Sequence, residues 1–294
     1  MLFHAQHGVI ASQSGLNPRS VAEDARIILS LYKWVESYSG DSIRVRRDSD
    51  NAEQDIGFAG SVLDTSAIET FGGGANVHVV TWYDQSGNGE DHTQSSASAQ
   101  GTVAFGDGYN SVVKTSSDGG PMVVFTGSYY TNGVGTSNYM SKNGTVVLHQ
   151  EEDSSVSFGV PYSELKSLLL VFAATSNSST SHYGAQHDNA GSPVTPSIER
   201  DVALNVIGSY IYEVDAGGNA SGSASATLRG YENNKNSFTP TSIDSRFSGD
   251  IATTILGSIG SGVNAFSGEI RTAMVFTKVF TNSERAALKT MKLT

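Results

Sequence analysis

The chain has 294 residues, a formal net charge of −11, 32 glycines and no cysteine. The negative charge argues against a nucleic acid or an anionic membrane as partner, because both are bound through basic patches. The lack of cysteine excludes disulfides and thiolate metal sites. The length suits a single all-β domain, and many glycines with only 16% charged residues are typical of short strands joined by tight turns.

The N-terminal segment predicts an arm and then a helix. Residues 1–19 show no periodicity, and we expect this arm to be ordered by a neighbouring molecule. Ser20 and Glu23 form a capping-box pattern, and apolar residues then recur at helical spacing as far as Val35. Gly40 is a natural stop. We therefore predict a helix that starts at Ser20 and ends near Gly40.

The next elements are a strand at residues 43–47, a short helix at 64–71 ended by three glycines, and a strand at 77–83. The segment 84–89 then has turn chemistry, because its Asp and Asn can bind nearby backbone amides and its glycines accept positive φ. Further strands are predicted at residues 122–126, 144–149, 167–175, 204–214, 223–231, 253–259 and 266–276.

The chain ends with a helix that starts at the capping pattern of Thr281 and Glu284 and runs to about Met291. The strands are separated by Gly-, Ser- and Asn-rich loops, with no βαβ alternation, no fixed repeat and no clear linker. No basic start followed by a long apolar stretch is seen, so no signal peptide is evident. The pattern predicts one mostly-β domain at residues 20–294, preceded by the arm at 1–19.

Three segments add more specific information: residues 38–57, residues 63–65, and residues 81–94 with the string TWYDQSGNG at 81–89. Their order and spacing resemble the N-terminal half of the catalytic domain of arabinofuranosidase B (glycoside hydrolase family 54). They equally resemble bacterial and phage proteins with a concanavalin-like, laminin-G-like fold, whose last strand and trailing helix are similar to residues 266–285. This resemblance implies a mostly-β, two-sheet concanavalin-like jelly-roll sandwich with an N-terminal helix and a short C-terminal helix.

The resemblance implies two catalytic carboxyl groups, which a retaining glycosidase holds about 5–5.5 Å apart. The segment that corresponds to the nucleophile of these enzymes is residues 182–191, which contains no Glu. The turn that corresponds to their acid/base Asp is residues 259–262, which contains no carboxylate, and their adjacent cysteine pair is missing. We therefore assign no catalytic residue. If the chain is nevertheless a hydrolase, the carboxylates to test first are Glu151, Glu152, Asp188 and Glu269.

Two sets of residues are candidates for ligand binding. The stretch around Tyr183 combines aromatic, polar and titratable groups, and loop tyrosines among Gly, Ser and Asn make adaptable contact surfaces. The candidates are Tyr183, His187, Asp188, Tyr129 and Tyr130, with Tyr109 and Tyr139 as further loop aromatics.

The segment around residues 81–89 has two interpretations. Its oxygen-rich loop suits Ca²⁺ or a sugar, whereas its position beside a hydrophobic strand favours a structural turn in which Asp84 is a cap and Trp82 lies in the core. We favour the structural interpretation and infer no cofactor, with Ca²⁺ as the alternative. The residues of this structural motif are Trp82, Tyr83, Asp84, Gln85, Gly87 and Asn88.

The acidic residues of segment 48–55 are expected to pair with Arg44, Arg46 and Arg47 rather than bind a metal. No metal site is predicted.

The missing carboxylates, the absent cysteines and the docking arm favour a non-enzymatic virion or surface protein, such as a phage head decoration, fibre or receptor-binding component. We expect it to contact other virion or surface proteins through residues 1–19, to form homo-oligomers and to reside in the virion after assembly in the host cytoplasm, or else to be secreted or displayed on a cell surface. Glycan binding is compatible with this role; nucleic-acid binding and membrane insertion are not expected. The alternatives are an arabinofuranosidase-like glycoside hydrolase and a free-standing lectin.

Overall fold

The computed structural model describes residues 15–132, 143–152, 159–165, 169–177, 180–187, 197–199, 208–215, 225–232, 235–236, 241–244, 253–258 and 266–289. The α-helices of these segments are α1 (Pro18–Ala22), α2 (Thr65–Gly72) and α3 (Asn282–Leu288). The strands before residue 133 are β1 (Ile27–Ser30), β2 (Ile43–Arg47), β3 (Glu53–Ile56), β4 (Phe58–Ala59), β5 (Val62–Leu63), β6 (Val77–Trp82), β7 (His92–Thr93), β8 (Thr102–Gly106), β9 (Ser111–Val113), β10 (Val123–Thr126) and β11 (Tyr130–Thr131).

The strands after residue 142 are β12 (Asn143–Glu152), β13 (Gly159–Leu165), β14 (Leu169–Asn177), β15 (Thr180–His187), β16 (Ser197–Glu199), β17 (Gly208–Asp215), β18 (Ser225–Glu232), β19 (Lys235–Asn236), β20 (Thr241–Asp244), β21 (Thr253–Leu256) and β22 (Ser267–Phe276). The mostly-β prediction is confirmed, and every strand predicted from the sequence overlaps a strand of the structure. No helix in the described segments is long and apolar enough to cross a bilayer.

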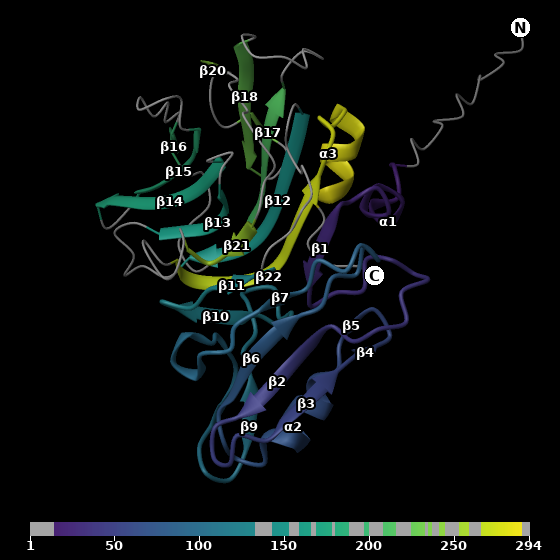
Figure 1. Ribbon diagram of the computed structural model, residues 1–294, viewed down its shortest axis with the longest axis vertical. Helices are drawn as coiled ribbons and strands as arrows, with labels where there is room; N and C mark the ends of the chain where they lie inside the picture. The colour runs from purple at the N-terminus through teal and green to yellow at the C-terminus, as the bar shows by residue number, and fades with distance from the viewer. Residues whose placement is uncertain are drawn as a thin grey trace, which may run out of the picture.

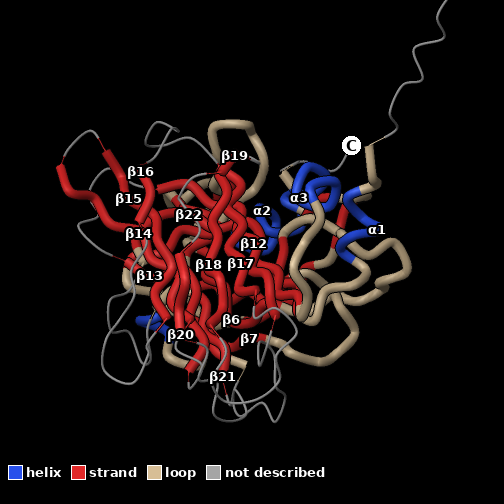
Figure 2. The backbone as a smooth tube through the Cα atoms, turned by 90° about the horizontal axis from the view of Figure 1, so that it is seen from above, coloured by secondary structure: helices blue, strands red, loops and turns tan. Residues whose placement is uncertain are grey.

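The strands form antiparallel layers that share pairings at their edges (Figures 1 and 2). One layer runs β22, β12, β17, β18 and β20, with β1 and β10 both paired to the free side of β22. A second runs β11, β21, β13, β14, β15 and β16, and a third contains β3, β2, β6 and β8. The strands β4 and β5 make a separate two-stranded ribbon. This is the expected β-sandwich, and β22 is central to it.

Two apolar clusters hold these layers together. The larger lies between the strand layers and includes Val146, Leu148 and Phe266. The smaller lies under α1 and α3 on the other face of β12 and β22, and it includes Trp34 and Val147. Alternate residues of β12 therefore enter different clusters, as the two-residue period of a strand requires. The outer face of β12 and β22, on the side of Trp34, carries the candidate site described below.

The predicted helix from Ser20 to Gly40 is wrong beyond its first turn. The helix α1 ends at Ala22, and residues Ile27–Ser30 instead form β1, whose four side chains are all buried. Leu29 enters the cluster between the sheets and Ile28 the cluster under the helices. A strand buried on both faces gives a continuous apolar run, which periodicity alone does not distinguish from a buried helix.

The capping predictions differ in outcome. The box of Ser20 and Glu23 is not formed, because Asn17 caps α1 by accepting from the Arg19 amide. Asp64 caps α2 by accepting from the Ala67 amide. The box of Thr281 and Glu284 is present at α3.

Candidate functional site

The segment at residues 84–89 is a turn bonded to the start of the domain. Asp84 is 4% exposed, and its carboxylate accepts hydrogen bonds from the amides of Ile28 (2.9 Å), Ser86 (3.0 Å) and Glu90 (3.1 Å). The Ser86 hydroxyl also donates to Asp84, at 2.6 Å. Both carboxylate oxygens are therefore used by protein donors. Within the described segments, no cluster of three or more His, Asp or Glu side chains could hold a metal ion.

The neighbours of Asp84 in this turn bind the same N-terminal segment. The Gln85 side chain donates to the carbonyls of Ser30 and Tyr32, each at 2.9 Å, and accepts from the Trp34 amide at 3.0 Å. Asn88 donates to the Arg26 carbonyl at 3.0 Å, and Gly87 has φ of +82°, a conformation that favours glycine. These bonds hold residues 26–34 in an extended path beside the turn.

The two aromatic residues before the turn, Trp82 and Tyr83, lie in different environments. Trp82 is fully buried and packs edge-on against Tyr130, with ring centroids 6.3 Å apart. The Tyr83 hydroxyl donates to Asp55 at 2.6 Å, and burial followed by this carboxylate raises the pKa of Tyr83. Neither ring is placed as an open platform for a sugar: one lies in the core, and the other is tied to β3 by its hydroxyl.

The expected exposure of Tyr130 is wrong. Its side chain is fully buried; its hydroxyl donates to the Val79 carbonyl at 3.0 Å and accepts from the Gly101 amide at 2.6 Å. Tyr129 is partly buried, and its carbonyl accepts from Gln94 at 2.9 Å. Tyr109 is 89% exposed at the turn between β8 and β9, as expected for a loop aromatic.

The other candidates for ligand binding lie in or beside β15. The backbones of Tyr183 and His187 belong to this strand, where they pair with Ala173 and Leu169 of β14. Their side chains, like Tyr139, Asp188 and the turn at residues 259–262, fall outside what the structure describes. The ligand-binding role of Tyr183, His187 and Asp188 stays a prediction.

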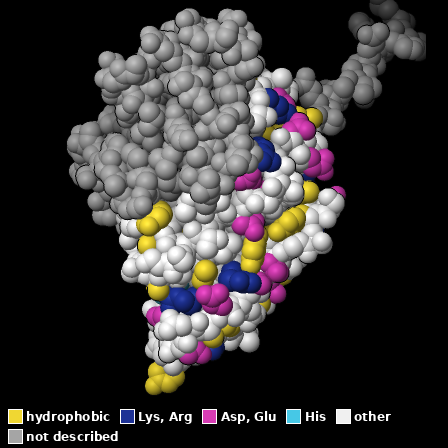
Figure 3. Space-filling view, in the orientation of Figure 1, with side chains coloured by type: hydrophobic (Ala, Val, Ile, Leu, Met, Phe, Trp, Pro, Cys, Tyr) yellow, Lys and Arg dark blue, Asp and Glu magenta, His cyan; other side chains and the backbone are white. Residues whose placement is uncertain are grey.

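The acidic run after β2 pairs with arginines, as predicted for two of its members. Arg44 contacts Asp55 at 2.8 Å and Arg47 contacts Asp50 at 2.7 Å. Arg46 differs: it is 9% exposed and bonds to Gln100 instead of a carboxylate. Figure 3 shows basic and acidic side chains intermixed over this part of the surface.

A pair of carboxylates on the outer face of the central layer is the strongest candidate for chemistry among the described residues. Glu151 of β12 is directly opposite Glu269 of β22. Residues opposite each other on antiparallel strands have Cβ atoms about 4.5–5.5 Å apart, with both side chains on one face. Glu151 is 6% exposed and the Glu269 side chain 14% exposed. This pairing needs a register that links distant parts of the chain, so sequence reasoning named both residues without predicting that they meet.

The hairpin at residues 114–122 covers this carboxylate pair. Lys114 forms an ion pair with Glu269 at 2.8 Å, and the Ser117 amide donates to Glu151 at 3.1 Å. A bridge between Thr115 and Pro121 closes the hairpin. One lysine and one backbone amide therefore hold the two carboxyl groups in position, each from a different part of the same hairpin.

A buried arginine fixes the hairpin to the sheet. The register between β12 and β22 shifts at Arg271, which has no residue opposite it, so this position is a β-bulge that redirects its side chain. Arg271 is fully buried and donates to both carboxylate oxygens of Asp118, at 2.9 and 2.5 Å. It also donates to Ser116, and its guanidinium lies 5.1 Å from the centre of the Tyr32 ring.

The ion pair between Arg271 and Asp118 makes the stability of the fold depend on pH. Burial raises the pKa of Asp118, but the hydrogen bonds from Arg271 and Ser116 outweigh it and hold the pKa well below its usual range. Because the folded-state pKa is lowered, the stabilisation is present above the unfolded-state value of about 3.9 and is lost as pH falls through the folded-state value. We expect urea unfolding midpoints of the wild type to fall steeply below about pH 4, and Asp118→Asn to remove part of that slope. Equal slopes for the two proteins between about pH 2 and 5 would contradict this.

Residues 25–156 match the family model of the catalytic domain of α-L-arabinofuranosidase B. The first half of the chain thus resembles an arabinofuranosidase catalytic domain. The similarity extends beyond the segments seen in the sequence and includes Glu151 of the carboxylate pair. A search of curated protein sequences gives no match.

Solved structures agree on the fold. A family 54 α-L-arabinofuranosidase with a cyclic sulfate inhibitor superposes with a TM-score of 0.63 at 15% identity, covering 93% of this chain and 66% of the other. An arabinofuranosidase complexed with arabinofuranosyl-α-1,2-xylobiose gives a TM-score of 0.60 at 15% identity, covering 93% and 65%. The chain thus spans slightly less than two thirds of these enzymes, and at this identity the likeness establishes the fold.

These findings correct the expected function. The interpretation as a non-enzymatic phage or virion structural protein is wrong, because the matched family is the catalytic domain of a glycoside hydrolase. Carboxylates missing at two positions of the chain do not exclude a glycosidase, because its chemistry requires two carboxyl groups at a given separation. The alternative named from the sequence, an arabinofuranosidase-like glycoside hydrolase, is the one that the comparisons favour.

Proposed function

We propose that this protein is a glycoside hydrolase of the arabinofuranosidase type, which releases arabinofuranosyl residues from glycans. The match of residues 25–156 to the arabinofuranosidase B catalytic domain carries the proposal. The net charge of −11 favours a neutral glycan over an anionic polymer as substrate.

We propose Glu151 and Glu269 as its two carboxyl groups. Their opposite positions on β12 and β22 allow carboxyl groups to stand about 5–5.5 Å apart, which is the separation of a retaining mechanism. In that mechanism one carboxylic acid protonates the glycosidic oxygen while the other carboxylate attacks the anomeric carbon; water then releases the sugar from the enzyme. In the sequence, Glu269 comes seven residues after the turn at residues 259–262, where the resemblance places the acid/base group. It is the third residue of β22.

The function is tested by incubating the whole chain with a panel of 4-nitrophenyl glycosides. We expect release of nitrophenol from the α-L-arabinofuranoside at a higher kcat/KM than from the corresponding pyranosides, because a site shaped for a furanose places the anomeric carbon of a six-membered ring differently. No release from any member of the panel, with a correctly folded protein at micromolar concentration, would contradict the proposal. Binding of the arabinofuranoside without release would favour the lectin alternative.

A further inference from the structure

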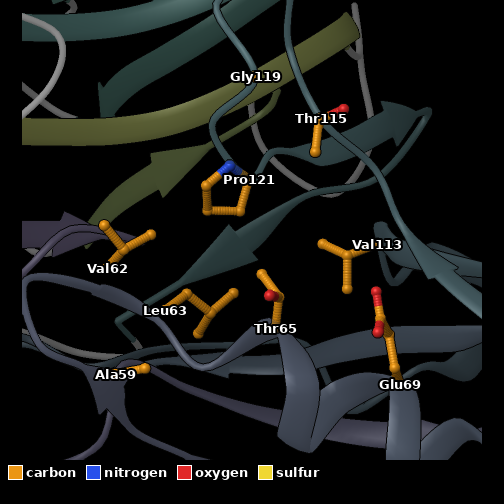
Figure 4. Close-up of a pocket in the computed structure, with 9 residues that line it drawn as sticks. All are labelled: Ala59, Val62, Leu63, Thr65, Glu69, Val113, Thr115, Gly119 and Pro121. Atoms are coloured by element: carbon orange, nitrogen blue, oxygen red, sulfur yellow. The ribbon is translucent and has the colours of Figure 1, made fainter.

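A hollow on the other side of the hairpin at residues 114–122 is separate from the carboxylate pair. It has a volume of about 330 Å³ and lies between this hairpin, the β4–β5 ribbon and the first turns of α2 (Figure 4). Neighbouring residues of an extended segment face opposite sides, so Lys114 reaches Glu269 while Thr115 lines the hollow. The two sites therefore share one hairpin but face opposite ways.

The inner walls of the hollow are apolar. Leu63 and Val113 are 2% and 5% exposed, and both line the hollow together with Val62 and Pro121. Figure 4 shows Leu63 and Val62 on one side of the space and Pro121 on the hairpin across from them. Such walls suit the C–H faces of a ring. The volume is at the lower end of the range for small-molecule sites, which is about 300–1,000 Å³.

Three polar side chains join these walls: Thr65 and Glu69 of α2, and Thr115 of the hairpin. In the part of the chain that the structure describes, none of the three side chains makes a hydrogen bond or an ion pair. Glu69 and Thr115 are exposed at the rim of the hollow and Thr65 is half-buried, so two hydroxyls and one carboxylate are open there to a ligand or to water. A few such polar groups in an apolar concavity are the usual composition of a small-ligand site.

We infer that this hollow binds one neutral sugar residue, as a second carbohydrate contact outside the proposed catalytic pair. A sugar offers an apolar ring face to Leu63, Val113 and Pro121, and hydroxyl groups that donate to Glu69 and pair with the two threonines. Glu69 disfavours uronic acids and sugar phosphates, because its exposed carboxylate repels a second negative charge at the rim of the hollow. Binding here involves no bond cleavage, so the inference stands or falls separately from the proposed hydrolase activity.

The test uses the full chain with ¹³C-labelled Leu and Val methyl groups and titrates it with methyl α-L-arabinofuranoside, methyl β-D-xylopyranoside and glucuronate. We expect saturable shifts of the Val62, Leu63 and Val113 methyls with at least one neutral glycoside and none with glucuronate. Thr115→Val should raise the Kd about tenfold, as loss of one hydrogen bond to the ligand does, and Glu69→Gln, which replaces a charged acceptor with a neutral one, should raise it by a smaller factor.

Thr70→Val and Glu53→Gln are the matched controls, since both residues are exposed and neither lines the hollow; their Kd values should equal that of the wild type. The inference is overturned if no neutral glycoside shifts these methyls at 50 mM or above, if glucuronate binds as well, or if Thr115→Val leaves the Kd unchanged. Titratable binding by a chain that fails to release nitrophenol would overturn the hydrolase proposal and leave this site standing.

Discussion

Replacing Glu151 and Glu269 in turn with glutamine is expected to lower kcat/KM for 4-nitrophenyl α-L-arabinofuranoside by about 10²–10⁴-fold for the acid/base group, the usual contribution of a positioned acid or base, and by more for the nucleophile. Glutamine has nearly the same shape, but it cannot protonate the leaving oxygen or attack the anomeric carbon. The two variants should also differ from each other. Loss of the acid/base group should remove one limb of the bell-shaped dependence of kcat/KM on pH. Loss of the nucleophile should leave almost no activity at any pH.

The control for this experiment separates chemistry from folding. Glu269 forms an ion pair with Lys114, so its replacement also removes a contact of the hairpin. Lys114→Met breaks the same ion pair but keeps the carboxylate, and it should retain much more activity than Glu269→Gln. Glu53→Gln changes an exposed carboxylate of β3 and should have no effect. If both glutamine variants keep activity within about threefold of the wild type, Glu151 and Glu269 are not the catalytic carboxyl groups.

The local elements of this fold could be predicted from the sequence because their signals are local. The glycines after α2 end it as predicted, with Gly73 at φ of +55°, and Thr281 and Glu284 form the predicted box at α3. β2 matches its prediction at both ends, because the alternation of Ile43 and Val45 with Arg44 is a local signal, and these three positions are buried, half-buried and buried as it predicts. In each case the residues that decide the structure are within a few positions of one another.

The predictions fail where residues that are distant in the sequence determine the structure. Ile27–Ser30 is a strand because β22 pairs with it and because Gln85 binds the chain that follows. The residues of this segment give no local signal for either contact. The same is true of the candidate site: Glu151 and Glu269 meet only through the register of β12 on β22, and the bulge at Arg271 sets that register beyond Thr272. The sequence identifies both carboxylates, but it does not show that they lie opposite each other.

The function could not be predicted from the sequence for a related physical reason. An expectation based on aligned positions treats a catalytic group as fixed to one place in the chain, whereas the chemistry requires two carboxyl groups at a given separation. In a β sheet, many pairs of opposite positions on neighbouring strands meet that requirement. The absence of Glu from residues 182–191 therefore excludes one arrangement of the pair and leaves others open.

Asp84→Ala is expected to lower the free energy of unfolding by about 3–5 kcal/mol. The carboxylate accepts from three backbone amides, those of Ile28, Ser86 and Glu90, and two of them lie in buried contacts. Alanine would leave these donors without a partner, and a buried donor without a partner costs about 1–3 kcal/mol. The loss would also release β1 from the turn, since the Ile28 amide is one of the three.

Asp107→Ala is the matched control for this variant. The Asp107 carboxylate likewise accepts from two backbone amides, those of Tyr109 (2.8 Å) and Asn110 (2.6 Å), but in an exposed turn where water can replace it. Urea unfolding of both variants should therefore show a large shift of the midpoint for Asp84→Ala and a small one for Asp107→Ala, with similar m-values. Equal shifts would mean that the turn at residues 84–89 is no more important than an ordinary surface turn. A large difference would show that the string TWYDQSGNG marks the fold through the bonds of Asp84 to β1, independently of any catalytic role.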